Sequence, residues 1–354
     1  MKFIMFVLRF GVGVALAGFC FAAFAAFLGF ASPLLDALNH LQPIWFTGTL
    51  VLLIFVAATF HTHPWRAGLL ALGASGFLAS AVIVIPEQLG GIFVRPISTQ
   101  GQQTYKLMSH NLFGLNEDMA RVANIIHEEA PDIIALQEFF EEQRAGLHPR
   151  IIGDYPYFAS CAGRKGAQIA LYSKMPFEVI EGTQCAQDSA REDNPVARLV
   201  IKFQSRDGND FNVVTTHLNW PVQVRPLFRD DLSWSEKLAA VPARKQLEWA
   251  ELSAAINGLT GPIVLAGDFN STSWSYAMRQ FVRGTELTRH SHGLLTYPTI
   301  FYIKGWRKVP ALVPIDHFMA SADVQVQQVV RGGQTGSDHL PIYGVFSLSE
   351  EAKN

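Results

Sequence analysis

Three long apolar segments near the start of the chain limit what it can fold into. Gly11–Ala31, Ile44–Phe60 and Ala67–Ile85 are runs of 21, 17 and 19 residues without a charged side chain. A helix needs about 20 apolar residues to cross the hydrocarbon core of a bilayer. Buried core helices are the alternative for the two shorter runs. Three such runs within the first 85 residues favour three transmembrane helices.

The charged residues divide the chain into two parts. Residues 1–103 hold only four of the 28 basic and two of the 30 acidic side chains, so the rest of the chain carries 24 basic against 28 acidic residues. That balance excludes a broad basic field for nucleic acid, although a local basic groove stays open. The segment before residue 104 is rich in Pro, Gly and Gln, as linkers are. We therefore predict an anchor over 1–86, a linker over 87–103, a soluble domain over 104–349 and a tail over 350–354.

Basic residues near the apolar runs predict the orientation. Lys2 and Arg9 precede the first run and Arg66 precedes the third, whereas residues 32–43 contain no Lys or Arg. The positive-inside rule then puts the N-terminus in the cytoplasm and the soluble domain outside it. If the first run is instead a cleaved signal peptide, the domain still ends outside. The prediction is an integral membrane protein with an extracytoplasmic domain, which is periplasmic or extracellular in a bacterium.

Two cysteines, Cys161 and Cys185, lie in the soluble part. In an extracytoplasmic domain they can pair as a disulfide, although their spacing alone does not show it. The alternative is two buried thiols. The sequence has no CxxC or Cys/His pattern of the kind that holds zinc.

The soluble part alternates strand and helix patterns. A helical face is expected around Val122, Ile125 and Ile126, and a second helix over Pro242–Asn257. Short apolar strands are expected over residues 105–112, 132–138, 168–173, 197–203, 211–218, 262–269, 315–321, 324–330 and 341–348. This pattern predicts an α/β domain.

Many of these strands end in one polar, chemically capable residue. The residues at strand ends or in the adjoining turns are Glu138, His217, Asp268, Asp316, Asp338 and His339. Carboxylates and histidines at strand ends are how a metal site is built on a rigid scaffold. Each residue alone is more often a turn, cap or surface residue, so the joint pattern carries the prediction.

Five motifs contain these residues in a fixed order. They are Ser109-His110-Asn111-Leu112, Leu136-Gln137-Glu138, Thr216-His217-Leu218-Asn219, Gly267-Asp268-Phe269-Asn270, and Ile315-Asp316-His317 together with Gly336-Ser337-Asp338-His339. The set resembles the endonuclease/exonuclease/phosphatase superfamily over about residues 104–349. The resemblance implies a four-layer α/β/β/α sandwich of two packed mixed sheets flanked by helices, here preceded by three transmembrane helices.

The resemblance also implies roles for the metal site. Glu138 suits Mg²⁺, a hard cation that prefers carboxylate oxygen, and Mn²⁺ is the alternative. Asn111 supplies a neutral carbonyl oxygen to the ion or orients the site. Asp268 aligns or deprotonates the attacking water, and Asn270 donates to the phosphoryl oxygens.

Two histidine–carboxylate pairs complete the implied chemistry. His339 is expected to act with Asp338, and His217 with Asp316, so that the pairs share acid and base work. Which histidine is the acid stays open. His317 should face away from Asp316, because side chains alternate along a strand. No catalytic role is expected for His110, His127, His148, His290 and His292.

The predicted function is a membrane-tethered, Mg²⁺-dependent hydrolase of phosphodiester bonds in extracytoplasmic nucleic acid or phospholipid headgroups. The alternatives are a phosphomonoesterase of the inositol-phosphate type and a non-catalytic binding module. The core chemistry does not choose the substrate. Residues 219–236 mix Arg with aromatic side chains, which suits base stacking, membrane insertion or an ordinary loop. No protein partner is inferred.

Overall fold

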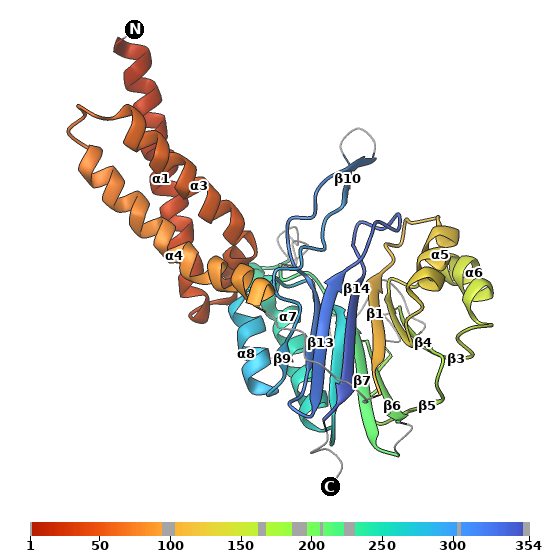
Figure 1. Cartoon of the computed structure of the whole chain (residues 1–354). Coiled ribbons are helices and arrows are strands. Elements are labelled where there is room, and N and C mark those ends of the chain that lie inside the picture. The colour runs from red at the N-terminus through yellow and green to blue at the C-terminus, as the bar shows by residue number, and fades with distance from the viewer. Residues whose placement is uncertain are drawn as a thin grey trace. The chain divides into compact units, whose positions relative to one another are not determined.

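The chain folds into two compact units (Figure 1). The computed structural model describes residues 2–93, 103–161, 168–185, 197–205, 208–222, 231–302 and 306–349. Unit 1 comprises residues 1–92 and 273–279, and unit 2 comprises residues 93–272 and 280–354. The predicted tail lies outside the described residues, as does most of the predicted linker.

Unit 1 is built from long apolar helices. Its elements are α1 (Lys2–Phe27), η1 (Leu28–Phe30), α2 (Pro33–Ala37), η2 (Leu38–Leu41), α3 (Gln42–Thr59) and α4 (Arg66–Phe93). Three helical stretches are long and apolar enough to cross a membrane, namely Phe3–Phe30, Pro33–Thr59 and Arg66–Gly90. Helix α4 continues through Pro86 to Phe93, where a linker was expected. A proline removes one backbone donor and bends a helix without always ending it.

Small residues let these helices approach closely. A Cβ on Gly48 would meet the Phe19 ring, and one on Gly76 would meet Cys20. Close approach at glycine is the usual means by which apolar helices associate without a hydrophobic driving force. Arg9 donates from Nη2 to the Thr59 carbonyl oxygen at 3.2 Å, which satisfies an orphan acceptor at the end of α3.

A buried carboxylate, Asp36, organises the turn between the first two long helices. Within unit 1 its oxygens accept hydrogen bonds from Ser275 Oγ at 2.8 Å and from the Tyr276 and Ala277 amides at 2.5 and 3.0 Å. Asn39 Nδ2 donates to the same carboxylate at 2.9 Å. Asp36 thereby satisfies free N–H groups at the start of α8 (Tyr276–Gly284).

The first sheet of unit 2 has six strands in the order β13-β14-β1-β2-β4-β3. Its strands are β1 (Tyr105–Asn111), β2 (Ile133–Gln137), β3 (Tyr157–Cys161), β4 (Ile169–Ser173), β13 (Val324–Arg331) and β14 (Ile342–Leu348). Strands β1 and β2 are parallel and all other neighbours are antiparallel. Helices α5 (Met119–Glu129) and α6 (Glu141–Ile151) flank this sheet (Figure 1).

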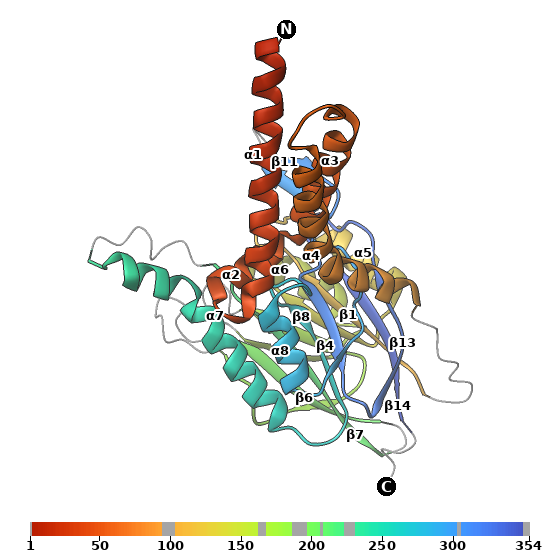
Figure 2. The ribbon, with the colours of Figure 1, turned by 90° about the vertical axis from the view of Figure 1, so that its left-hand side faces the viewer.

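The second sheet has six strands in the order β5-β6-β7-β8-β12-β9. Its strands are β5 (Phe177–Val179), β6 (Arg198–Gln204), β7 (Asp210–His217), β8 (Ile263–Asp268), β9 (Thr288–Arg289) and β12 (Asp316–Ala320). Only β7 and β8 are parallel among these neighbours. Helices α7 (Trp234–Asn257) and α8 flank this sheet (Figure 2). A separate hairpin pairs β10 (Ile300–Tyr302) with β11 (Trp306–Lys308).

The two sheets pack face to face over an aromatic core. Tyr105, Phe211 and Phe346 meet with ring centroids 4.9–6.0 Å apart, and Phe203 stacks on Phe211 at 5.2 Å. These rings are at most 2% exposed. The predicted fold class, two mixed sheets flanked by helices and preceded by three apolar helices, is confirmed.

Helix α7 begins eight residues before the predicted start at Pro242. Ser233 and Glu236 form a capping box, in which each side chain binds the other's backbone N–H. Residues 233–236 contain this capping pattern in the sequence. The earlier start was not predicted, because Pro242 was expected to stand in the first turn of the helix. The predicted strands match the observed ones to within a residue or two.

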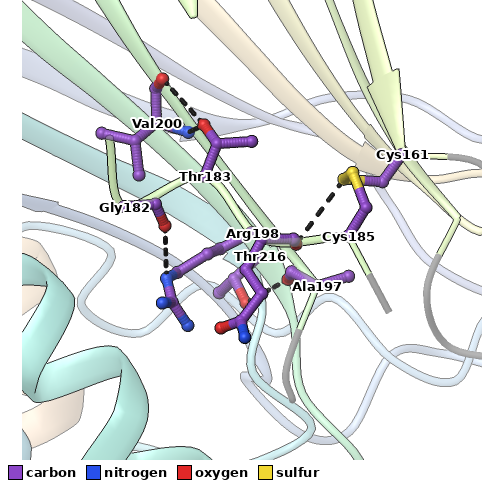
Figure 3. Close-up of a disulfide and its surroundings, with 9 residues drawn as sticks. Cys161, Gly182, Thr183, Cys185, Ala197, Arg198, Val200 and Thr216 are labelled. Atoms are coloured by element: carbon purple, nitrogen blue, oxygen red, sulfur yellow. Dashed lines mark hydrogen bonds between the residues drawn. A yellow bond between two sulfur atoms is a disulfide. The ribbon is translucent and has the colours of Figure 1, made fainter. Parts of the chain in front are cut away.

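A disulfide joins Cys161 of β3 to Cys185, with the two Cα atoms 5.0 Å apart (Figure 3). The residue before Cys185, Gln184, pairs with Arg198 of β6. The bond therefore links the edge strand of the first sheet to the second sheet. It confirms the pairing considered from the sequence.

Replacing both cysteines by serine should lower the stability of the protein. The bond joins residues 24 apart in the sequence. A closed loop of that size lowers the entropy of the unfolded chain and stabilises the folded state by about 3 kcal/mol. For a domain of this size that corresponds to a fall in Tm on the order of 10 °C. Thermal unfolding of the oxidised protein and of the variant measures it. An unchanged Tm would show that the bond contributes nothing.

Candidate active site

Strand register brings the predicted residues to one end of both sheets. In the second sheet His217 of β7 pairs with Asp268 of β8, and Asp268 pairs with Asp316 of β12. In the first sheet Asn111 of β1 pairs with Gln137, the residue before Glu138. Because the sheets pack face to face, these two rows of strand ends meet.

Asp268 is the central group of this cluster and is fully buried. Its Oδ2 accepts a hydrogen bond from Asn111 Nδ2 at 2.9 Å and lies 3.3 Å from Asn270 Nδ2. The same oxygen is 3.4 Å from His217 Nε2 and 3.7 Å from His339 Nε2. Burial alone would raise the pKa of Asp268, but the positive charge of His339 and the hydrogen bonds from His217 and Asn111 outweigh it and lower that pKa.

His339 is held by Asp316. Its Nδ1–H donates to Asp316 Oδ2 at 2.9 Å, and both side chains are almost completely buried. Burial disfavours the imidazolium, but the carboxylates of Asp316 and Asp268 dominate and raise the pKa of His339 to about 10. His339 is therefore a cation at neutral pH.

The expected histidine–carboxylate pairing is wrong. Asp316 contacts His339 and not His217, because β12 runs beside β8 and places Asp316 next to the loop that carries His339. His217 instead lies against Asp268 and 3.2 Å from Asn270 Nδ2. Burial opposes protonation of His217, yet the contact with Asp268 raises its pKa.

Asp338 stands apart from this pairing. Its Oδ1 is 4.0 Å from His339 Nε2, beyond a hydrogen bond. Burial raises the pKa of Asp338 to about 7; the charge of His339 opposes this, and the carboxylates of Glu138, Asp268 and Asp316 add to it. The site therefore brings four carboxyl groups together with two histidines.

Asn111 and Glu138 lie together at the edge of the cluster. Asn111 Nδ2 is 3.3 Å from Glu138 Oε1, while its Oδ1 accepts from the Phe113 amide at 2.9 Å. That second bond fixes the orientation of the amide, so its N–H group faces the carboxylates, and the amide oxygen keeps one lone pair beside the bond from Phe113. Glu138 Oε2 accepts from the Gly114 amide at 2.7 Å.

Two of these residues have left-handed backbone. Glu138 has φ of 51° and Asn270 has φ of 46°. Non-glycine residues with positive φ are uncommon and cluster where a side chain must be aimed at a functional site. Glu138 directly follows β2 and Asn270 lies two residues after the end of β8, and these turns aim Glu138 at Asn111 and Asn270 at Asp268.

The donor chemistry fits a divalent metal ion. Asp268, Asp316 and His339 form a buried group whose potential ligand atoms all lie within 4.8 Å of one another. Because both nitrogens of a protonated His339 are donors, the carboxylates are the groups that suit an ion. Glu138 adds a less buried carboxylate beside it. Hard oxygen donors from clustered carboxyl groups suit a cation such as Mg²⁺.

Several site residues were not predicted from the sequence. Ser337 Oγ donates to the Asn111 carbonyl oxygen at 2.7 Å and accepts from the His339 amide at 3.0 Å, which ties the two motifs together. The Tyr297 ring lies 4.8 Å from the His339 ring and 5.6 Å from that of Trp220. Ser337 stands within the Gly336-Ser337-Asp338-His339 motif.

The histidines set aside lie outside the cluster around Asp268. His110 is buried with Nε2 2.8 Å from Thr335 Oγ1, and burial together with the charge of His339 lowers its pKa to about 3. His317 contacts Ser291 and the Ser271 carbonyl oxygen, away from Asp316 as expected. His127 lies on α5, is exposed, and has its Nε2 3.5 Å from Asp154 Oδ2.

Comparison with known proteins gives a family match. The model of the Endonuclease/Exonuclease/phosphatase family matches residues 108–339. No curated protein sequence matches.

Three solved structures are similar to this chain, and the first of them shows the same fold. An endonuclease/exonuclease/phosphatase from Bacteroides vulgatus is 18% identical over 70% of this chain and 100% of its own, with a TM-score of 0.53. A family protein from Bacteroides thetaiotaomicron is 15% identical over 70% and 99%, with a TM-score of 0.48. A mannosyl-6-phosphatase from the same organism is 16% identical over 69% and 100%, with a TM-score of 0.46.

The contact between His339 and Asp316 predicts unequal effects of two substitutions. Asp316→Asn should lower the pKa of His339 by about one to three pH units, since it removes the nearest opposite charge. Asp338→Asn should lower it less, because that carboxylate lies farther away. Histidine NMR titration of metal-free protein measures both. Equal shifts, or a larger one in Asp338→Asn, would contradict the observed pairing.

Proposed function

Because the chain belongs to the Endonuclease/Exonuclease/phosphatase family, we propose that it is a membrane-tethered, Mg²⁺-dependent hydrolase of phosphodiester bonds outside the cytoplasm. Its substrate class is nucleic acid or a phospholipid headgroup. The observation that carries the proposal is the convergence of two histidines and a surplus of carboxylates on Asp268. All eight predicted site residues fall within the matched region, 108–339.

Glu138 is the residue best placed to hold the ion, with Asp268 beside it. The carboxylate of Glu138 is the less buried of the two, and its observed partners are N–H donors, which leave lone pairs for a cation. The Asp316–His339 pair is closed by its own hydrogen bond, so we assign it to proton chemistry. When bound, a divalent ion neutralises phosphoryl oxygens and lowers the pKa of coordinated water.

We assign Asp268 to aligning or deprotonating the attacking water, and Asn270 to donating a hydrogen bond to the phosphoryl oxygen. A carboxylate whose pKa is lowered stays ionised at neutral pH and accepts a hydrogen bond from water. Asn270 Nδ2 lies 3.2 Å from His217 Nε2 and is anchored to the Leu218 carbonyl oxygen at 2.8 Å. These contacts hold His217 Nε2 and Asn270 Nδ2 beside Asp268, and we assign the two groups to the negative charge that develops in phosphoryl transfer.

His339 supplies a fixed positive charge. Its Nδ1–H is committed to Asp316, so Nε2 is the nitrogen that faces Asp268 and the reacting groups. An imidazolium held in one orientation stabilises an anionic transition state and donates a proton to the leaving oxygen.

Exposed apolar side chains support the membrane tether. Phe3, Phe21 and Val51 are 63–78% exposed on the long helices of unit 1. Contiguous exposed apolar surface marks a membrane or partner contact. The helices carry almost no charge, as lipid-facing segments do.

Two observations support an extracytoplasmic domain. A disulfide persists in oxidising compartments and is rare in the cytosol. Asp36, in the base-free turn, binds residues 275–277 within unit 1, so the turn and this segment lie on one side of the membrane. Both agree with the charge pattern around the first three helices.

Residues 219–236 bear on the substrate, and the structure describes 219–222 and 231–236 of them. Trp220 is 49% exposed and packs edge-on against Tyr297, which itself touches His339. An exposed aromatic beside the reacting groups suits a nucleobase or a lipid surface. Arg225 and Arg229, the arginines of residues 219–236, lie outside the described residues.

A substrate panel tests the activity. Full-length protein in detergent with Mg²⁺ should cleave at least one of plasmid DNA, RNA, sphingomyelin and phosphatidylinositol, and lose activity in chelator. Glu138→Ala should raise the Mg²⁺ concentration needed, and His339→Ala should lower kcat about 10²-fold or more. Inositol polyphosphates in the panel test the phosphomonoesterase alternative.

The matched control is His127→Ala, because His127 is exposed on α5 and pairs with Asp154. It should leave the rate unchanged. If Asp268→Ala and His339→Ala together left hydrolysis intact, the site would be wrongly assigned. If wild type cleaved nothing on the panel, the hydrolase proposal would fail.

Reporter fusions test the side of the membrane. A reporter fused after Gly101 should be active if it works only outside the cytoplasm and silent if it works only inside, because three spans put residue 101 opposite the N-terminus. A fusion after His63, between the second and third helices, is the opposite control. Activity at Gly101 of a reporter that works only in the cytoplasm would contradict the proposed topology.

A further inference from the structure

One buried cation in unit 2, Lys245, takes no part in the chemistry described above. It is 5% exposed on α7, and its Nζ donates to the carbonyl oxygens of Asn219 and Phe269, each at 2.5 Å. The ammonium also lies 5.4 Å from the Trp249 ring centroid. Lysine is almost never buried unless its charge is matched, so this position needs a reason.

The two carbonyl groups belong to the strand ends that carry the site. Phe269 stands between Asp268 and Asn270, and Asn219 stands two residues after His217. The β7–β8 ladder ends at the His217–Asp268 pair, followed by one bond from the Leu218 amide to the Asp268 carbonyl oxygen at 3.0 Å. Among the described residues no further backbone bond joins the two strand ends beyond that point. Lys245 connects Asn219 to Phe269, next to the bond from Asn270 Nδ2 to the Leu218 carbonyl oxygen.

Glu248, one turn along α7, holds the same segment from its other side. Its Oε2 accepts from the Asn219 amide at 2.9 Å, and its Oε1 accepts from Asn219 Nδ2 and, at 3.1 Å, from Arg244 Nε. Glu248 is 1% exposed. The lysine takes the carbonyl oxygen of Asn219 and the glutamate takes its N–H, so one turn of helix fixes this residue completely.

The charge of Lys245 is retained at neutral pH. Burial lowers its pKa to about 8, and the nearby carboxylates of Glu248 and Asp268 oppose that fall. An ammonium has three donors, of which two serve the strand ends. An apolar side chain of the same length would pack here but would leave two carbonyl groups unsatisfied in the interior.

We propose that Lys245 is a positioning residue, which clamps the ends of β7 and β8 so that His217, Asp268 and Asn270 keep their mutual contacts. The contacts to be kept are those of His217 Nε2 with Asp268 Oδ2 at 3.4 Å and with Asn270 Nδ2 at 3.2 Å. The catalytic consequence rests on the proposed function. A displacement of about 1 Å in a catalytic group can cost about 10²-fold in rate.

The test compares Lys245→Ala with and without n-propylammonium, the fragment that the substitution removes, in the full chain in detergent. Amide hydrogen exchange should speed up in peptides covering 216–222 and 267–272, and kcat should fall about 10²-fold while KM changes little. Propylammonium should restore both, and the neutral n-propanol neither. Lys237→Met is the matched control, since Lys237 lies on the same helix over the Trp234 ring.

Each outcome decides the proposal. Unchanged exchange in both peptides, or altered exchange with full kcat in an active enzyme, overturns it. If wild type cleaves no substrate, the proposed function fails while the exchange measurement still decides whether Lys245 clamps the strand ends. If Lys245→Ala does not fold, Glu248→Gln takes its place, with kcat expected to fall about tenfold and an unchanged kcat overturning the clamp.

Discussion

The Asp268 carboxylate sits at the end of β8 with no exposed surface, and the arrangement of the site follows from what keeps it ionised there. A buried carboxylate without partners would be protonated. Here one oxygen meets the side chains of Asn111, Asn270, His217 and His339. Those four residues come from both sheets, so the charge at Asp268 is stable only when the sandwich is closed.

The histidines that stabilise the Asp268 carboxylate are buried themselves and require partners for their own charge. The histidines that face it need carboxylates of their own, and Asp316 meets that need for His339. Glu138 and Asp338 add two further carboxyl groups, and burial, followed by the charges of Glu138, Asp268 and Asp316, raises the pKa of Asp338 to about 7 against the charge of His339. A site assembled in this way holds more carboxyl groups than histidines, which suits a hard divalent cation.

Sequence periodicity was sufficient for the strands that carry the site and for an α/β domain, whereas the four-layer sandwich was predicted from the family resemblance. Apolar runs such as Pro262–Phe269 are buried on both faces, and their short length and the turn motifs that flank them favour a strand over a buried helix. Helix α6 and the short strands β3 and β5 were not predicted. Strand β3 is partly exposed on an edge, and α6 contains Pro149, so neither has a clear apolar period.

The contacts within the site could not be predicted from order along the chain. Asp338 precedes His339 directly, but adjacent side chains diverge, and the carboxylate that holds His339 comes from 23 residues earlier. Lys245 did leave a signal. It occupies the stripe of α7 that Val241, Trp249 and Leu252 bury, at spacings of three and four residues, and a charge on such a stripe requires buried partners.

Anomalous diffraction from crystals of the full chain grown with Mn²⁺ would test the site most directly. A single strong peak bounded by the Glu138 carboxylate and adjacent to Asp268 is predicted, and crystals of Glu138→Ala should lose it. Mn²⁺ is the suitable probe because it accepts the same oxygen donors as Mg²⁺. A peak elsewhere with none beside Glu138, or an unchanged peak in the variant, would contradict the claim that these strand ends form a divalent-metal phosphoesterase centre.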